Sequence, residues 1–406
     1  MLPPHVFQAQ FQALWFSLKA TFHYPPSLPK AQSRSLETPR LILDADRLEH
    51  NAARMRERSL ELGVSLRPHL KTAKSLEVAR IATNGTFGPI TVSTLNEAEY
   101  FARGGYKDLL YAVSIVGNKL ARVDQIQRTT DARILLVVDS VEAAKLLVER
   151  TIELNSNFGC LIEIDCGEHR SGVLPVEEDV LPIAEALAGS RRVRLDGVMT
   201  HAGHSYSTAD RRKIAEIAEI ERRSAVEAAR ILQETGVPTP IVSVGSTPTV
   251  LFAEHLGGVT EVRCGIYLFW DMAQFSRGVC RMEEIAISVL AAVIGHNRQG
   301  SRIIVDAGAL ALSKDLGANE YLPDTKYGYV CDSYSGERLS LLSVDSVHQE
   351  HGAISVKDAS WFDRLPIGSL VRIVPNHACL TCAAYFDYTV VREGTIVDQW
   401  ERTNGW

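Results

Sequence analysis

The basic segment 67–74, RPHLKTAK, follows a short apolar run and contains a lysine, Lys71, that could act as a nucleophile. A lysine amine forms a Schiff base with an aldehyde when burial or nearby cations lower its pKa. Arg67, His69 and Lys74 are the cationic neighbours that this segment supplies. The alternative is an ordinary solvated lysine, so the role of Lys71 depends on what other groups the fold brings to it.

A second segment has the residue types of a phosphate-binding loop. In the run Gly245-Ser246-Thr247-Pro248, Thr247 is predicted as a helix N-cap and Pro248 as the first helical residue. That arrangement leaves backbone N–H groups free for a phosphate. Further along, Gly265 permits close backbone approach and Tyr267 offers a hydroxyl donor. A lysine opposite a phosphate cradle indicates pyridoxal phosphate (PLP), whereas a plain capped helix and a tyrosine closing the rim are the alternatives.

A histidine and a cysteine two positions apart, His377 and Cys379, follow a predicted strand at 370–374. An imidazole and a thiolate together suit zinc. Two protein ligands leave coordination positions open, as a catalytic metal requires. Cys382, three positions further on, would allow a structural metal site instead.

These groups need a scaffold, and the hydrophobic pattern predicts one. Short β-rich runs alternate with helical patterns, which is typical of parallel βαβ units. Eight runs are the number that closes a (β/α)8 barrel, and a doubly wound open sheet is the alternative. The predicted strands are 64–71, 90–95, 109–115, 134–139, 160–165, 195–201, 241–246 and 262–266. The predicted helices include 46–62, 75–83, 97–102, 141–154, 182–188 and 211–235.

The active site of such a barrel lies on the loops that follow the C-terminal ends of the strands. Lys71 closes the first predicted strand, and Arg170 follows the fifth. His201, His204 and Tyr206 come at and after the end of the sixth. We therefore expect these side chains on the same face of the barrel as the run that begins at Gly245.

Beyond about residue 280 the helical patterns become few, which predicts an all-β second domain. Its strands are predicted at 285–294, 302–305, 327–331, 339–344, 370–374 and 386–391. We divide the chain into an N-terminal extension at 1–37, a PLP-binding barrel at 38–280 and a β domain with the metal site at 281–406. Residues 38–45 can pair with the β domain. Residues 1–36 are either a weak targeting segment or a loosely attached extension, and no role is assigned to them. The polar pair Glu350-His351 also has no assigned role.

Composition argues against several classes of protein. Hydrophobic residues make up 46% of the 406 and charged residues 23%, with a mean hydropathy of -0.02, as in soluble globular proteins. The longest apolar runs, such as 285–295, fall short of the roughly 18 residues of a membrane-spanning helix. A net charge of -6 and a pI near 6.1 argue against nucleic acid as a partner. Seven scattered cysteines do not resemble a disulfide framework, which favours a reducing, cytoplasmic location.

Five segments together resemble the D-serine dehydratase and D-threonine aldolase family of fold-type III, alanine-racemase-like PLP enzymes, from about residue 38 to the C-terminus. They are Arg67–Lys71, His201–Tyr206, Gly245–Thr249, Val305–Gly308 with Ala311–Ser313, and Pro375–Cys379. The resemblance implies Lys71 as the Schiff-base lysine and Arg170 as the partner of the pyridine nitrogen. It implies that the phosphate is surrounded by Gly245, Ser246, Thr247, Gly265 and Tyr267. Tyr206 is a further cofactor contact, and His201 and His204 are candidate catalytic residues.

The resemblance also implies a reaction. D-Serine would lose water to give a 2-oxo acid and ammonia, with D-threonine or 3-hydroxy-D-aspartate as further substrates. Lys71 would remove the α-proton, and Zn²⁺ on His377 and Cys379 would polarise the β-hydroxyl. His-x-Cys favours the dehydratases, since the aldolases are associated with His-x-Asp and a harder ion such as Mn²⁺ or Mg²⁺, with Co²⁺ a further alternative. Retro-aldol cleavage with His201 or His204 as base, a racemase and a non-catalytic PLP carrier are the alternatives, and a homodimer is expected.

Overall fold

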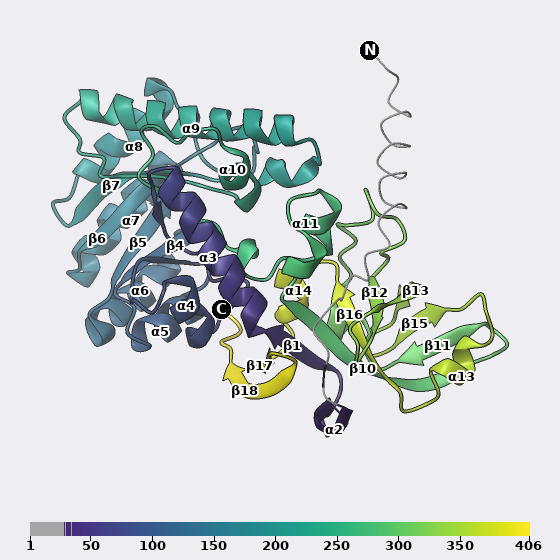
Figure 1. Cartoon of the computed structure of the whole chain (residues 1–406). Coiled ribbons are helices and arrows are strands. Elements are labelled where there is room, and N and C mark those ends of the chain that lie inside the picture. The colour runs from purple at the N-terminus through teal and green to yellow at the C-terminus, as the bar shows by residue number, and fades with distance from the viewer. Residues whose placement is uncertain (1–27, 29, 34) are drawn as a thin grey trace, which may run out of the picture.

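Two β-sheets organise the chain, whose computed structural model describes residues 28, 30–33 and 35–406 (Figure 1). Most of the predicted N-terminal extension therefore lies outside the described residues. An eight-stranded parallel sheet occupies the first part of the chain, and a ten-stranded sheet is built mostly from the last part. No described helix is long and apolar enough to cross a membrane.

The eight-stranded sheet runs in the order β2-β9-β8-β7-β6-β5-β4-β3. Its end strands β2 and β3 are joined by a bridge between His69 and Thr91, where the Leu70 N–H donates to the Thr91 carbonyl at 2.9 Å. This bridge closes the sheet into the predicted barrel. The strands are β2 (Ser65–Leu66), β3 (Ile90–Val92), β4 (Asp108–Ser114), β5 (Arg133–Val138), β6 (Phe158–Ile164), β7 (Val193–Thr200), β8 (Ile241–Val244) and β9 (Glu261–Val262).

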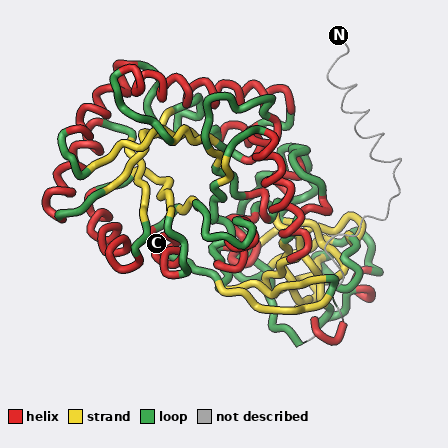
Figure 2. The backbone as a smooth tube through the Cα atoms, turned by 60° about the vertical axis from the view of Figure 1, so that its left-hand side comes forward, coloured by secondary structure: helices red, strands yellow, loops and turns green. Residues whose placement is uncertain are grey.

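Helices form an outer layer around these strands (Figure 2). Helix α3 begins where the Asp44 side chain accepts a hydrogen bond from the Arg47 N–H at 3.1 Å, and its apolar residues Leu48, Ala52 and Met55 are buried. The helices are α3 (Ala45–Glu61), α4 (Leu76–Ala82), α5 (Leu95–Arg103), α6 (Gly117–Thr130), α7 (Val141–Leu154), α8 (Glu177–Ala188), α9 (Arg211–Glu234) and α10 (Thr247–Phe252). All six predicted helices are present. Helix α8 starts five residues before the predicted residue 182, so Pro182 lies inside the helix and not at its start.

The ten-stranded sheet is centred on its longest strand, β10 (Ile287–Asn297), which lies between β1 (Arg40–Asp44) and β16 (Leu370–Pro375). Strand β1 pairs antiparallel with β10 and parallel with β17, so it belongs to this sheet and not to the barrel. The other strands are β11 (Arg302–Val305), β12 (Gly328–Asp332), β13 (Arg338–Ser343), β14 (Ser346–Val347), β15 (Gly352–Ser355), β17 (Asp387–Arg392) and β18 (Thr395–Glu401).

Short helices fill the connections around the two sheets. They are α2 (Lys30–Ser33), α11 (Met272–Ser276), α12 (Ala309–Leu312), α13 (Trp361–Arg364) and α14 (Ala378–Cys382), with 3-10 turns η1 (Gly203–Ser207), η2 (Ile266–Leu268) and η3 (Met282–Glu284). Four strand predictions ran two residues or more past the observed ends. Strand β2 ends at Leu66 instead of residue 71, and β9 ends at Val262 instead of residue 266. Strand β3 ends at Val92 instead of residue 95, and β8 ends at Val244 instead of residue 246. After β2 and β9 the main chain still hydrogen bonds to its neighbours, as from the Arg67 N–H to the Val262 carbonyl at 2.9 Å and from the Arg263 N–H to the Val244 carbonyl at 2.9 Å, but no regular ladder continues.

Candidate active site

Lys71 lies in a turn two residues after the His69 bridge, not at the end of a strand as predicted. Main-chain hydrogen bonds tie the segment to the chain beyond β9, with the His69 N–H donating to the Cys264 carbonyl at 2.7 Å. The Lys71 side chain is exposed, whereas Thr72 and Ala73 directly after it are buried. The turn therefore presents the amine of Lys71 while its own main chain is held in the core.

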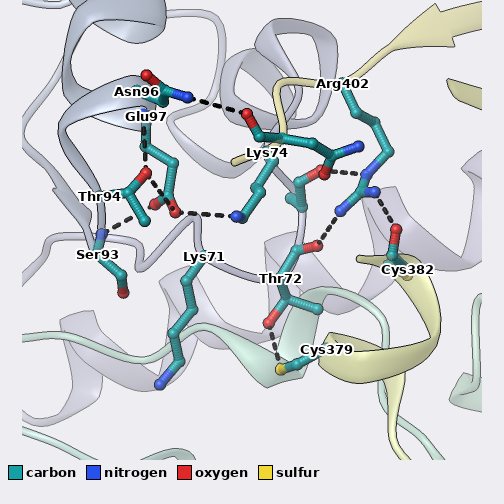
Figure 3. Close-up of polar contacts among 12 residues, drawn as sticks. Lys71, Thr72, Lys74, Ser93, Thr94, Asn96, Glu97, Cys379, Cys382 and Arg402 are labelled. Atoms are coloured by element: carbon teal, nitrogen blue, oxygen red, sulfur yellow. Dashed lines mark hydrogen bonds and ion pairs between the residues drawn. The ribbon is translucent and has the colours of Figure 1, made fainter. Parts of the chain in front are cut away.

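The cationic neighbours predicted for Lys71 are not available as free charges, so this part of the prediction was wrong. Arg67 donates to Glu261 at 2.9 Å and to Asp108 at 3.0 Å inside the barrel. Lys74 pairs with the buried carboxylate of Glu97 at 3.3 Å, and Figure 3 shows the Lys71 side chain pointing away from this pair. Burial, and then the charge of Lys71, hold the pKa of His69 well below its usual value.

His201 is one of the candidates that the fold brings close to Lys71. Its Nδ1 lies 2.8 Å from the Gly245 carbonyl, which can only accept a hydrogen bond, so Nδ1 carries the proton. Burial and then repulsion from Lys71 lower the pKa of His201 to about 3. His204, by contrast, lies in η1 over Gly167 in the loop after β6, and its Nδ1 is buried.

The loop after β8 is organised by its own cap and by a buried carboxylate. The N-cap of α10 is Ser246, whose side chain accepts from the Thr249 N–H at 3.3 Å, so the predicted cap at Thr247 was one residue late. Glu221 of α9 accepts from the Gly245 N–H at 2.9 Å and from the Thr249 hydroxyl at 2.7 Å. Tyr206 contacts the same loop, because its hydroxyl accepts from the Thr247 N–H at 3.2 Å.

Unsatisfied buried groups around this loop fit a phosphate ester. The Tyr267 hydroxyl and the Thr247 Oγ1 are buried without a hydrogen bond of normal geometry to any described residue. Such groups are costly unless a ligand satisfies them, and hydroxyl donors suit phosphate oxygens. Gly265 packs so closely on the His69 carbonyl that a Cβ would lie 2.5 Å from it, which explains the glycine there. The residues present therefore fit the phosphate of PLP.

Arg170 follows β6 and lies close enough to His201 for its charge to contribute to the lowered pKa of that histidine. Its guanidinium is exposed and its one hydrogen bond among the described residues, to Glu168, is long at 3.5 Å. Arg263, the other arginine near His201, is buried inside the barrel and donates to the Ser243 hydroxyl at 2.7 Å and to the Thr200 carbonyl. Arg170 is thus the arginine that remains able to contact a ligand.

His377 and Cys379 lie at the start of α14, next to the turn at residues 70–73 that contains Lys71, called the lysine turn below. Cys379 Sγ is 2.9 Å from Thr72 Oγ1, and His377 Nδ1 is 2.7 Å from Asp315 Oδ2. Because the Asp315 contact occupies Nδ1, Nε2 is the histidine nitrogen that a metal could bind, in place of its hydrogen bond to Cys379. Burial raises the pKa of the Cys379 thiol, but hydrogen bonding from His377 and the charge of Lys71 outweigh it and leave the pKa below its usual value.

The donor set matches a soft, catalytic type of metal site with few protein ligands. Among the described residues, no three His, Cys, Asp or Glu side chains are grouped in a way that could hold an ion. Cys382 lies in the core, where burial raises the pKa of its thiol to about 12. One imidazole and one thiolate nevertheless fit zinc with open positions. Glu350-His351 lies in the exposed turn between β14 and β15, packed over Gly308.

Several residues of the site were not found from the sequence: Thr72, Glu221 and Asp315. Thr72 adjoins Lys71 and could have been suspected from that position. Asp315 contacts a histidine 62 positions later, and Glu221 lies mid-helix in an otherwise ordinary amphipathic pattern. No local pattern marks either carboxylate.

The barrel, the mostly-β second domain and the lysine beside a phosphate-fitting loop define a fold-type III PLP enzyme. Residues 43–272 match the family described as alanine racemase, N-terminal domain, and residues 286–391 match the putative serine dehydratase domain. The chain therefore belongs to the alanine-racemase-like family of PLP-dependent lyases that includes D-serine dehydratases and D-threonine aldolases. The resemblance found in the motifs is confirmed.

Individual relatives cover nearly the whole chain. The D-threo-3-hydroxyaspartate dehydratase of Delftia sp. (strain HT23) is 42% identical over 92% of this chain and 98% of its own length. The D-serine dehydratase of Dictyostelium discoideum is 32% identical over the same shares. A solved structure of the Delftia enzyme, 41% identical, superposes with a TM-score of 0.87 over 94% of this chain and 100% of that one. A cysteine-to-alanine mutant of D-threo-3-hydroxyaspartate dehydratase, 42% identical over 92% of this chain and 99% of that one, with a TM-score of 0.88, is described as metal-free.

Proposed function

We propose that this chain removes water from D-3-hydroxy amino acids, using PLP and zinc, to give a 2-oxo acid and ammonia. The proposal rests chiefly on the 2.9 Å contact between Thr72 Oγ1 and Cys379 Sγ, which sets the His-x-Cys pair beside the lysine turn. D-Serine and D-threo-3-hydroxyaspartate are the first substrates to consider. The two relatives described above are named for acting on them.

The residues divide the chemistry between them. PLP, when held by Lys71 and the loop at Gly245–Thr247, supplies a sink for electrons from the bond broken at the α-carbon. His377 Nε2 and Cys379 Sγ would hold Zn²⁺, which would supply Lewis-acid chemistry at the β-hydroxyl. Lys71, freed when the substrate amine takes its place, would take the α-proton through its Nζ and pass it to the departing hydroxyl, which would leave as water. The enamine that remains takes up water and releases ammonia and the oxo acid.

Other side chains hold these groups in place. Asp315 orients His377 through Nδ1, and Thr72 donates to the thiolate of Cys379. Arg170 is assigned to the pyridine nitrogen, where an always-charged donor keeps that nitrogen unprotonated and weakens the ring as a sink. A weak sink makes help at the leaving hydroxyl necessary, which is the reason for a metal in this reaction.

The choice of dehydration over retro-aldol cleavage is supported by two features. Cys379 is a soft ligand that favours zinc over Mn²⁺ or Mg²⁺. Retro-aldol cleavage needs a base for the β-hydroxyl proton, and His201, with a pKa of about 3, is a poor base at neutral pH. His204 lies against Gly167 of the loop after β6, and no described contact joins it to Lys71.

The deciding experiment is product identification with the purified full chain. D-Serine, D-threonine and both diastereomers of 3-hydroxy-D-aspartate are incubated with PLP and zinc, and the products are identified by mass spectrometry. Pyruvate, 2-oxobutyrate or oxaloacetate with ammonia supports dehydration. Glycine with an aldehyde would establish the aldolase instead, L-serine from D-serine a racemase, and no conversion of any substrate a carrier.

We also propose a homodimer in the cytoplasm. Large apolar side chains are exposed on and around α12 and α14, beside the proposed metal ligands, and a second subunit could cover them. They are Leu310, Leu316, Leu380 and Phe386. All seven cysteines are unpaired, as expected in a reducing compartment. Light scattering that gives the mass of one chain would refute the dimer, and fractionation of cells that finds the protein elsewhere would refute the location.

A further inference from the structure

Arg402 lies just after β18, near the C-terminus, and its guanidinium is buried against the lysine turn (Figure 3). The Nη2 group donates to the Thr72 carbonyl at 3.1 Å, and Nε donates to the Ala73 carbonyl at 3.1 Å. The Nη1 group donates in the opposite direction, to the Tyr385 carbonyl at 2.7 Å and to the Cys382 carbonyl. One side chain therefore joins two segments that lie more than 300 positions apart in sequence.

The two joined segments are the ones that carry the proposed chemistry. Thr72 directly follows Lys71, and its hydroxyl contacts Cys379. Cys382 is the last residue of α14, the helix that begins after His377 and contains Cys379. Arg402 thus holds the main chain on both sides of the contact between the lysine turn and the metal-ligand helix.

Neighbouring contacts reinforce this arrangement. The Thr403 N–H donates to the Lys74 carbonyl at 2.8 Å, and the Tyr388 hydroxyl donates to the Ala73 carbonyl at 2.6 Å while it accepts from Arg402 Nε at 2.8 Å. All of these partners are neutral oxygens, and no described carboxylate forms an ion pair with Arg402. A buried cation with neutral partners is costly to desolvate, so its retention needs the sum of many hydrogen bonds.

We propose that Arg402 is a positioning residue that sets the distance between Lys71 and the metal ligand Cys379. This inference rests on the proposed function, in which Lys71 takes the α-proton and Cys379 binds the zinc ion that acts on the departing hydroxyl. Both events act on adjacent carbons of one substrate, so the two protein groups must keep a fixed separation. A displacement of about 1 Å in such a pair costs up to roughly a hundredfold in rate.

Lysine is the informative substitution, because it keeps the positive charge and lacks the planar guanidinium group. Three donors on a single nitrogen do not span two segments as a planar guanidinium does. In Arg402→Lys we expect unchanged cofactor absorbance and zinc content, a kcat at least about tenfold lower, and a KM within about threefold of wild type. Amide hydrogen exchange in peptides covering 70–76 should become faster, with no change in peptides from β4 to β6.

Arg372→Lys is the matched control. Arg372 is also a fully buried arginine of the second domain, but it donates to Ser288 within the sheet. A loss of kcat in Arg402→Lys no larger than in Arg372→Lys would overturn the inference, as would unchanged exchange at 70–76. If Arg402→Lys does not fold, Tyr388→Phe removes the hydroxyl between Arg402 and Ala73 and should lower kcat in the same way to a smaller extent.

The exchange measurement also separates this inference from the proposed function. A wild-type enzyme that releases no oxo acid from any substrate in the panel would refute the dehydratase. Faster exchange at 70–76 in Arg402→Lys but not in Arg372→Lys would still support the positioning role. Equal exchange in the two variants would overturn it whatever the reaction.

Discussion

Replacing Asp315 by asparagine tests whether His377 is a metal ligand. The Asp315 Oδ2 lies 2.7 Å from His377 Nδ1, so it fixes the ring with Nε2 directed away from the carboxylate. Carboxylates that hold a ligand histidine in this way are typically worth 10- to 100-fold in metal affinity, or about 1.4 to 2.8 kcal/mol. The Asp315 side chain is 26% exposed and its partner 35%, so water screens part of the charge. Asparagine also keeps an acceptor, and we expect the lower limit, about tenfold weaker zinc binding.

Zinc affinity is measured by competition with a chromophoric chelator, and activity is measured across the same zinc series. Asp315→Ala removes the acceptor as well and should approach the hundredfold limit. Asp387→Asn is the control, since Asp387 is 24% exposed and pairs with Arg40 at 3.0 Å in the second sheet. Wild-type zinc affinity in both Asp315 variants would refute the assignment of His377. Equal losses in Asp387→Asn would show that the effect is a general one on the domain.

Three further predictions concern the other groups of the site. Lys71→Ala should abolish the visible absorbance band of the imine between lysine and PLP, whereas Lys74→Ala should keep it, because Lys74 is held by Glu97. The opposite pattern in absorbance spectra would exchange their roles. Cys379→Ala should lose zinc and keep PLP, and its rate of dehydration should fall by at least about a hundredfold. Cys379→Asp should shift the metal preference toward Mn²⁺ or Mg²⁺. Full zinc content and turnover in Cys379→Ala would refute the metal site. Arg170→Glu should change product ratios more than PLP affinity, since the phosphate provides most of the binding, and unchanged ratios would refute its assignment to the pyridine nitrogen.

Periodicity in the sequence predicted the alternation of strands and helices, whereas the choice of a closed barrel over an open sheet rested on the count of eight strands and on the family resemblance, and helix α6 was not predicted. Helix α7 was predicted with the observed bounds, Val141–Leu154, because its apolar residues recur at helical spacing and Ser140 caps its start. Strand β11 was likewise predicted correctly as Arg302–Val305. Boundaries failed where a strand pairs with its neighbours over only two residues, as in β2 and β9. There main-chain hydrogen bonds continue past the strand, as from the His69 N–H to the Cys264 carbonyl at 2.7 Å, without forming a regular ladder.

The composition of the candidate site was predicted better than its electrostatics. Lys71, Cys379 and the loop at Gly245 were proposed from local residue types together with their positions at strand ends and the family resemblance, since each local pattern alone is weak. The neighbours that neutralise Arg67 and Lys74 are Glu261 and Glu97, and nothing in their local sequence links them to those cations. Pairing of charges depends on which strands and helices lie side by side, and spacing along the chain does not report that.

The chain joins its two sheets at both ends, and this explains how a barrel lysine can work with a ligand from the β domain. Near the start, Asp44 ends β1 in the second sheet and caps α3 of the barrel, while Asn51 of α3 donates to the Glu284 carbonyl at 2.8 Å. At the other end, Arg402 donates a hydrogen bond to the Thr72 carbonyl of the lysine turn at 3.1 Å. Two separated attachments resist rotation of one domain on the other, whereas a single linker would permit it. The contact between Thr72 and Cys379 therefore follows from the placement of β1 and of the C-terminal residues, and weakening either attachment should impair catalysis before it unfolds a domain.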